Sequence, residues 1–127
     1  MQNILSMSAD QEIWRLRRIR VYKGLPVSFY TYYADPIYCN SISVENAEKD
    51  DIINTVEQAI GIKIHKISQT LRSVVADLDI SSVLKIPFGA AVFFNEGTYH
   101  SASGQILFFS QAYYRGDMFA LRTTSML

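Results

Sequence analysis

The stretch GQILFFSQAYYRGDMFAL, Gly104 to Leu121, decides the fold. Side chains along a strand point to opposite faces in turn, and from 106 to 114 both faces of this run are largely apolar. Such a strand needs cover on both sides, so we expect it at the centre of a sheet. Gly116 permits a bulge or sharp bend where the apolar run ends. We expect Arg115 and Asp117 to pair at that strand end, and Tyr114 to form part of a ligand pocket wall.

Composition limits the possible classes of protein. The chain has 127 residues, of which 49% are hydrophobic and 19% charged, which predicts one globular domain, 1–127, with a real core. Twelve basic and twelve acidic residues balance, so the whole chain offers no basic field for nucleic acid or an anionic membrane. The single cysteine, Cys39, excludes an internal disulfide and fits a reducing cytoplasm. No apolar run approaches the ~18 residues of a membrane span, and the start does not resemble a signal peptide.

A strand rich in arginine is predicted near the start of the chain, at 13–22, with the sequence IWRLRRIRVY. Its four arginines allow two interpretations. One is a solvated sheet face, or arginine stems laid over aromatic rings. The other is a grip on an anion by Arg18 and Arg20, which lie two residues apart and therefore on the same face. The residues alone leave both open.

The remaining pattern completes an α+β domain with a mainly antiparallel sheet, because few helices separate neighbouring strands. Asp50-Asp51 and Gly61 are predicted to begin and end a helix, since acidic residues suit its N-terminus and glycine its C-terminus. The expected elements are strands at 27–33, 62–78, 88–99 and 119–123, helices at 52–60 and 79–84, a short helix at 4–8 and an irregular connection at 39–49.

Taken in order, these features resemble the UTRA (UbiC transcription regulator-associated) domain. That domain is the effector-sensing half of HutC-type members of the GntR family of bacterial transcription factors. The resemblance covers roughly Ile4 to Thr123 and includes Arg18-Ile19-Arg20, Gly24-x-Pro26, Gly61, Pro87-x-Gly89 and Tyr114-Arg115-Gly116-Asp117. It implies the chorismate-lyase-like fold. It also implies that the DNA-binding winged helix-turn-helix and the first strand of the domain are absent from this chain.

The resemblance also implies a ligand-binding set, with three departures. In sugar-phosphate sensors of the family, the arginines at the places of Arg18 and Arg20 contact the ligand, and the tyrosine at Tyr114 is kept. Tyr30 and Phe108 stand where glutamates are common, although Phe108 has the alternative of a plain core position. Asp50 or Asp51 stands where a serine helps to bind the anion, and an acidic residue there would repel it. The expected ligand-binding residues are Arg18, Arg20, Tyr30, Asp51, Phe108 and Tyr114.

We expect a binding module rather than an enzyme. The sequence shows no convergent Ser/His/Asp or Cys/His set, no carboxylate pair and no metal-ligand spacing, and we interpret His65 as a surface residue. We therefore expect no cofactor and no metal. The leading hypothesis is a cytoplasmic, homodimeric domain that binds a small anionic metabolite and meets DNA only through the winged helix-turn-helix. The alternatives are a chorismate-lyase-like enzyme and a dimerisation domain with a vestigial pocket.

Overall fold

The computed structural model describes residues 13–39, 42 and 51–127. The helix expected at 4–8 and most of the connection expected at 39–49 lie outside the described residues. The described elements are β1 (Trp14–Tyr22), β2 (Leu25–Ala34), α1 (Pro36–Cys39), α3 (Ile52–Ile60), β3 (Lys66–Val75), α4 (Leu78–Leu84), β4 (Ala91–His100) and β5 (Ile106–Arg115). The predicted α+β class is confirmed.

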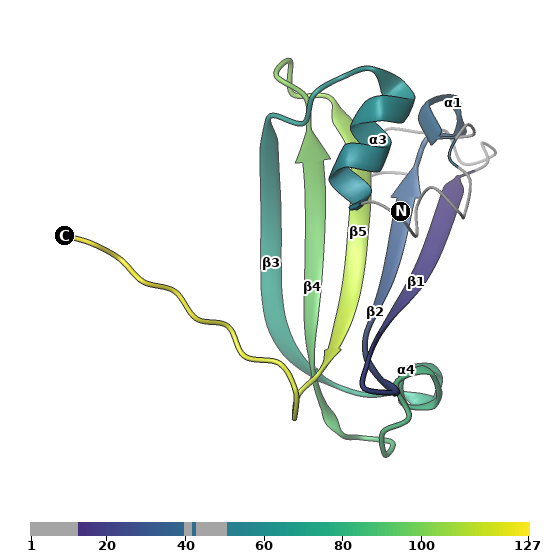
Figure 1. The fold of residues 1–127 in the computed structure, drawn as a ribbon, viewed down its shortest axis with the longest axis vertical. Coiled ribbons are helices and arrows are strands. Elements are labelled where there is room, and N and C mark those ends of the chain that lie inside the picture. The colour runs from purple at the N-terminus through teal and green to yellow at the C-terminus, as the bar shows by residue number, and fades with distance from the viewer. Residues whose placement is uncertain (1–12, 40–41, 43–50) are drawn as a thin grey trace.

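The strands form one antiparallel sheet in the order β1-β2-β5-β4-β3 (Figure 1). β5 is therefore the middle strand, as its two apolar faces predict. Leu107, Phe108 and Phe109 are 1%, 0% and 3% exposed, although their side chains alternate along the strand. The core is consequently built on both sides of β5.

Two helices cover different parts of the sheet, at its two ends in Figure 1. Ile52 and Val56 of α3 belong to one core cluster with Tyr32 and Phe108. The α4 residues Ile80 and Leu84 form a second cluster with Phe29 and Val92. The strand register places Tyr32 and Phe108 on one side of the sheet, the α3 face, and Phe29 and Val92 on the other, the α4 face.

The helix boundaries follow from capping side chains. The Asp51 carboxylate accepts a hydrogen bond from the Asn54 N–H (2.8 Å), so α3 begins where the sequence predicts. Gly61, at φ 70°, ends it and donates its N–H to the Glu57 carbonyl at 2.9 Å. Asp77 caps α4 in the same way through the Ile80 N–H (2.9 Å).

Several expectations on secondary structure differ from the structure. α1 at Pro36–Cys39 was not predicted, because four residues give too short a periodic pattern to detect. The strand expected at 62–78 runs only from Lys66 to Val75, and its C-terminal end is set by the chain leaving the sheet so that Asp77 can cap α4. The strand expected at 88–99 begins only at Ala91, after a turn at Phe88 and Gly89. No strand forms at 119–123, where the chain is extended and runs away from the sheet (Figure 1).

The end of β5 is a tight turn. Arg115 donates two hydrogen bonds to the Asp117 carboxylate, at 3.0 and 2.9 Å, which confirms the predicted pair. These bonds lower the pKa of Asp117. The Gly116 N–H donates to the Ala91 carbonyl oxygen at 3.0 Å, and a Cβ on Gly116 would lie only 2.4 Å from that oxygen. Only glycine fits this approach of β5 to the start of β4.

We predict that Gly116→Ala lowers the free energy of unfolding by about 1–3 kcal/mol, because the added methyl group has to push the Ala91 backbone aside. Denaturant unfolding followed by circular dichroism measures this. Ala120→Ser, at an exposed position just beyond the turn, is the control and should change stability by less than about 0.5 kcal/mol. Equal stabilities of Gly116→Ala and wild type would contradict the close approach.

Candidate functional site

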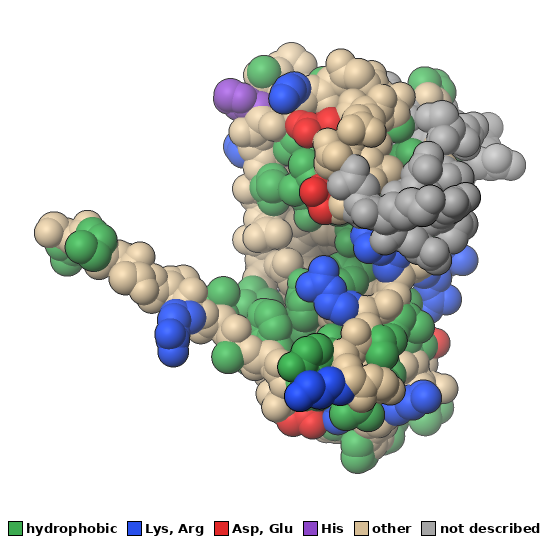
Figure 2. All heavy atoms as spheres, in the orientation of Figure 1, with side chains coloured by type: hydrophobic (Ala, Val, Ile, Leu, Met, Phe, Trp, Pro, Cys, Tyr) green, Lys and Arg blue, Asp and Glu red, His purple; other side chains and the backbone are tan. Residues whose placement is uncertain are grey.

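A cavity of about 220 Å³ opens on the α3 face between β1, β2 and the first residues of α3. Its lining is Arg18, Ile19, Arg20, Tyr30, Tyr32, Asp51 and Ile52. In Figure 2, Lys and Arg side chains gather below α3 on the visible face, next to hydrophobic ones. Basic groups thus lie beside an apolar surface, which suits a small anionic molecule with some apolar area.

The hairpin of β1 and β2 separates the arginines by face. Arg18 pairs with Tyr30 and Arg20 with Ser28 across the two strands, so both arginines lie on the α3 face. The guanidinium of Arg20 is 5.7 Å from the centroid of the Tyr30 ring, within the range of a cation–π contact. The two guanidinium groups that line the cavity therefore belong to Arg18 and Arg20, the two arginines that the sequence predicts on one face.

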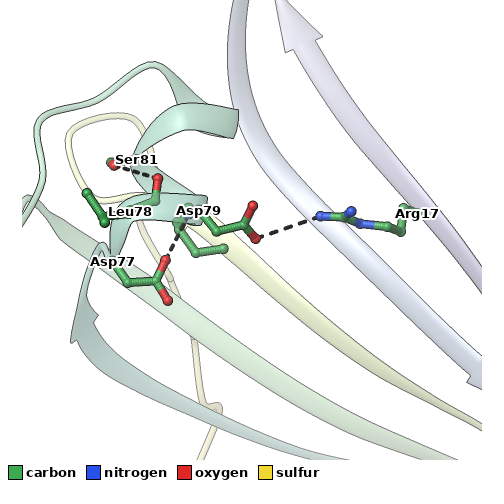
Figure 3. Close-up of polar contacts among 6 residues, drawn as sticks. Arg17, Asp77, Leu78, Asp79 and Ser81 are labelled. Atoms are coloured by element: carbon green, nitrogen blue, oxygen red, sulfur yellow. Dashed lines mark hydrogen bonds and ion pairs between the residues drawn. The ribbon is translucent and has the colours of Figure 1, made fainter.

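Arg17 lies on the opposite face. It fits the other interpretation of the arginine-rich strand, in which arginine stems lie over aromatic rings. Its guanidinium is 4.6 Å from the centroid of the Phe29 ring. Figure 3 shows the same side chain directed from β1 toward Asp79 in α4, with a nitrogen–oxygen distance of 3.8 Å. Both partners of this ion pair are largely exposed, so it adds little stability. Arg17 holds β1 next to α4 and does not contribute to the cavity.

Tyrosine rings form the wall behind the arginines. Tyr30 and Tyr32 are parallel, with centroids 6.0 Å apart, and the ring of Tyr114 meets Tyr30 edge-on at 5.7 Å. Burial raises the pKa of Tyr32 to about 12, although the positive charge of Arg18 opposes the shift. Burial and a hydrogen bond with Tyr30 raise the pKa of Tyr114. These hydroxyls stay protonated at neutral pH and can donate hydrogen bonds.

The N-terminus of α3 forms the opposite side of the cavity. A helix N-terminus carries partial positive charge, which favours an anion. In this chain the Asp51 carboxylate already accepts the Asn54 N–H and brings negative charge to the lining. The cavity therefore holds two guanidinium groups and one carboxylate, and the arginines set the sign of its charge.

The structure brings four of the six sequence-predicted site residues into one cavity: Arg18, Arg20, Tyr30 and Asp51. Tyr114 is not in the lining and lies behind Tyr30. Phe108 needs a correction, because it is fully buried in the core, stacked on Tyr99 at 3.9 Å and edge-on to Tyr32 at 6.3 Å. It supports the wall through Tyr32 and does not line the cavity.

Sequence reasoning missed three lining residues. Tyr32 follows Tyr30 by two positions on the same face, so strand alternation could have found it. Ile52 follows Asp51 at the helix start, and the sequence analysis assigns it only to the helix expected at 52–60. Ile19 alternates to the other face, and it borders the cavity because β1 is an edge strand. No sequence signal indicates that last position.

A second hollow of about 270 Å³ lies on the α4 face, lined by Arg72, Val74, Val75, Asp77, Ile80, Phe94 and Tyr113. Its charged groups have partners, because Arg72 pairs with Glu96 and Asp77 caps α4. It is a weaker candidate than the cavity beside α3. In the part of the chain that the structure describes, no three His, Cys, Asp or Glu residues converge as metal ligands, and no helix is long and apolar enough to cross a membrane.

The chain matches a known protein family. The family model for the UTRA domain matches residues 1–120. No curated protein matches the chain.

Solved structures of bacterial regulators share the fold. A GntR-family transcriptional regulator from Enterococcus faecalis has a TM-score of 0.86 at 21% identity, over 98% of this chain and 88% of that one. The ligand-binding domain of a putative GntR-family regulator from Bordetella bronchiseptica has a TM-score of 0.85 at 14% identity, over 98% and 80%. The effector-binding domain of the Bacillus subtilis trehalose repressor has a TM-score of 0.83 at 16% identity, over 99% and 87%.

The raised pKa of Tyr32 predicts a loss of stability in alkali. The folded chain holds this proton up to a pH of about 12, whereas an unperturbed tyrosine releases it near 10.0. The contribution is therefore complete below pH 10 and is lost as the pH rises toward 12, by at most about 3 kcal/mol. We expect Tyr32→Phe to flatten this part of the profile, measured by denaturant unfolding between pH 8 and 11.5. Superposable profiles for Tyr32→Phe and wild type would show that Tyr32 ionises freely.

Proposed function

This chain belongs to the UTRA domain family, and on that premise we propose that it is the effector-binding domain of a HutC-type GntR regulator. In this proposal a small anionic metabolite binds the cavity beside α3. The domain forms a homodimer, and a winged helix-turn-helix elsewhere in the full-length protein contacts DNA in the bacterial cytoplasm. The shared fold of GntR-family effector domains supports the proposal.

The observation that carries the proposal is the arginine pair beside the tyrosine wall. The ion pairs of the described residues engage Arg17, Arg72 and Arg115, and not Arg18 or Arg20. Two guanidinium groups on one face can bind a carboxylate or phosphate with several charge-assisted hydrogen bonds. Arg18 is half-buried, so less water competes with it for the anion than with the exposed Arg20.

The rest of the lining favours an anion with an apolar or planar part. Tyr30 and Tyr32 offer ring faces, and Ile52 adds aliphatic surface opposite them. Rings supply burial and stacking but few hydrogen bonds. A polyhydroxylated sugar phosphate would leave hydroxyls unpaired, at a cost of roughly 1–3 kcal/mol each. Because Phe108 is in the core, this preference depends on the tyrosines and Ile52 and not on Phe108.

Effector sensing in such a domain depends on linkage between two equilibria. A ligand that binds one dimer geometry more tightly than another shifts the population by its difference in affinity. No catalytic group is needed for this, and the cavity offers protonated tyrosines, arginines and one carboxylate rather than an activated nucleophile. Kinship with chorismate lyase is a matter of fold and supplies no activity by itself.

One observation favours a second candidate function, a dimerisation domain with a vestigial pocket. The carboxylate of Asp51 lies in the lining, where it opposes an anion. The variant Asp51→Ser separates the two functions, because it removes the negative charge and keeps the helix cap.

We predict that Arg18→Ala or Arg20→Ala weakens anion binding by about 2–4 kcal/mol, with little change in the free energy of unfolding. Asp51→Ser should strengthen anion binding, because serine caps a helix as aspartate does but carries no charge. Calorimetry for affinity and denaturant unfolding for stability measure these effects.

Arg15→Ala is the matched control, since Arg15 is an exposed arginine of the same strand whose side chain is on the opposite face. It should bind like wild type. If Arg18→Ala and Arg20→Ala unfold the domain, the arginines are structural and the anion grip is wrong. If no anion shifts the melting temperature of wild type or of Asp51→Ser across a broad metabolite library, the vestigial pocket is the better description.

The chemistry of the effector gives the next prediction. We expect aromatic or aliphatic acids, as carboxylates or phosphates, to bind more tightly than N-acetylglucosamine 6-phosphate, because the tyrosine wall stacks on planar groups and leaves sugar hydroxyls unpaired. Titration of this panel by calorimetry decides it. Tight binding of the sugar phosphate with none of the acids bound would contradict the expected preference and leave the anion grip intact.

A further inference from the structure

One buried hydroxyl of the sheet lacks a hydrogen-bond partner. The side chain of Ser28 is 1% exposed, and its Oγ bonds to none of the described residues. Ser110, a second buried serine, differs from it, because its hydroxyl donates to the Tyr99 hydroxyl at 3.3 Å. Burying a hydroxyl without a partner costs stability, and alanine would fill nearly the same space without that cost. Packing alone therefore does not explain the hydroxyl of Ser28.

Ser28 lies at the edge of the cavity beside α3. It pairs with Arg20 of β1 on one side and with Tyr114 of β5 on the other, and Tyr30 follows it by two positions. All four side chains are consequently on the α3 face, and two of them, Arg20 and Tyr30, line the cavity. Residues directly opposite in two strands have Cβ atoms about 5 Å apart. Because Arg20 is exposed and Ser28 is buried, the serine hydroxyl lies at the base of the arginine side chain.

The polar groups around Ser28 are directed to other partners. The guanidinium of Arg20 lies 5.7 Å from the centroid of the Tyr30 ring, and the hydroxyl of Tyr114 is hydrogen-bonded with Tyr30. A cation–π contact of an exposed guanidinium is weak, and an arginine side chain has many rotamers. A change in the rotamer of Arg20 alone would therefore connect Ser28 with the cavity at little cost.

We propose that Ser28 is a third donor of the effector site, whose hydroxyl binds an oxygen of the anionic group that Arg18 and Arg20 hold. Arg20 leaves the ring of Tyr30 for the anion, and the same movement gives the Ser28 hydroxyl its acceptor. An oxyanion suits this place, because hydrogen bonds to a charged acceptor are stronger than neutral ones and a guanidinium lies alongside. The inference rests on the proposed function and adds a residue that determines where the anion lies.

Carboxylates and phosphates both supply such an oxygen, so phenylacetate and phenyl phosphate are the two probes. Calorimetry should show that Ser28→Ala binds them about tenfold or more weakly than wild type does. A loss for both probes assigns Ser28 to an oxygen that both anions present. A loss for phenyl phosphate alone assigns it to the additional oxygen of a tetrahedral anion. Ser110→Ala, a buried serine on the same face, is the matched control and should bind like wild type.

The melting temperature without a probe separates a binding role from a structural one. Ser28→Ala removes a hydroxyl that has no partner among the described residues, so it should melt no lower than wild type. Ser110→Ala loses the bond to Tyr99 and should melt lower. Ser28→Cys is a second variant, of similar size but with a weak donor, and it should bind the probes about as weakly as Ser28→Ala.

Three results would overturn the proposal. Wild-type affinity in both Ser28 variants removes Ser28 from the site and leaves the arginine grip intact. A lower melting temperature of Ser28→Ala, together with wild-type affinity in Ser28→Cys, makes the hydroxyl structural. If wild type binds neither probe at millimolar concentration, the anion site of the proposed function fails together with the third donor.

Discussion

The structure depends on covering both faces of β5. Phe108 and Phe109 are neighbours in the chain and point to opposite faces, and both are almost completely buried. Each large ring that is removed from water contributes about 1.5–3 kcal/mol, so neither face can remain bare. α3 covers Phe108 through Val56, and β2 and β4 flank the strand on both sides. The sheet order with β5 in the middle follows from this constraint.

The cavity is a consequence of where that cover ends. α3 has nine residues and the strands have nine or ten. A helix rises only about 1.5 Å per residue and a strand about 3.3 Å, so α3 spans only part of the length of the sheet. Its first turn stops beside β1 and β2, so the lining passes from buried Ile52 to exposed Arg20 over a short distance. An edge strand suits the arginines, because their stems lie on the sheet while their charges keep access to water. Anion binding at this boundary uses charges that the core could not hold.

The sequence was most informative where a local rule determines the outcome. Asp51 and Gly61 predict α3 at its observed bounds, because capping requires few residues. Alternation assigns Arg18 and Arg20 to one face, since a strand leaves no other choice. Alternation does not say how far from the helix a residue on that face lies, so Phe108 could not be distinguished from a cavity residue. The strand expected at 119–123 shows the same limit, because a strand pattern cannot identify the strand with which it pairs.

Aromatic contacts connect the cavity to Phe119, just beyond the end of β5. Tyr30 lines the cavity and meets Tyr114, and Tyr114 in turn stacks on Phe119 at 4.4 Å. Contact alone does not create coupling, because a ligand shifts an equilibrium only by its difference in affinity for the two states. A tenfold difference, about 1.4 kcal/mol, would be enough to change the balance between two dimer arrangements tenfold. The ring pair of Tyr30 and Tyr114 lies where such a difference would act, since an effector against Tyr30 bears on the same stack.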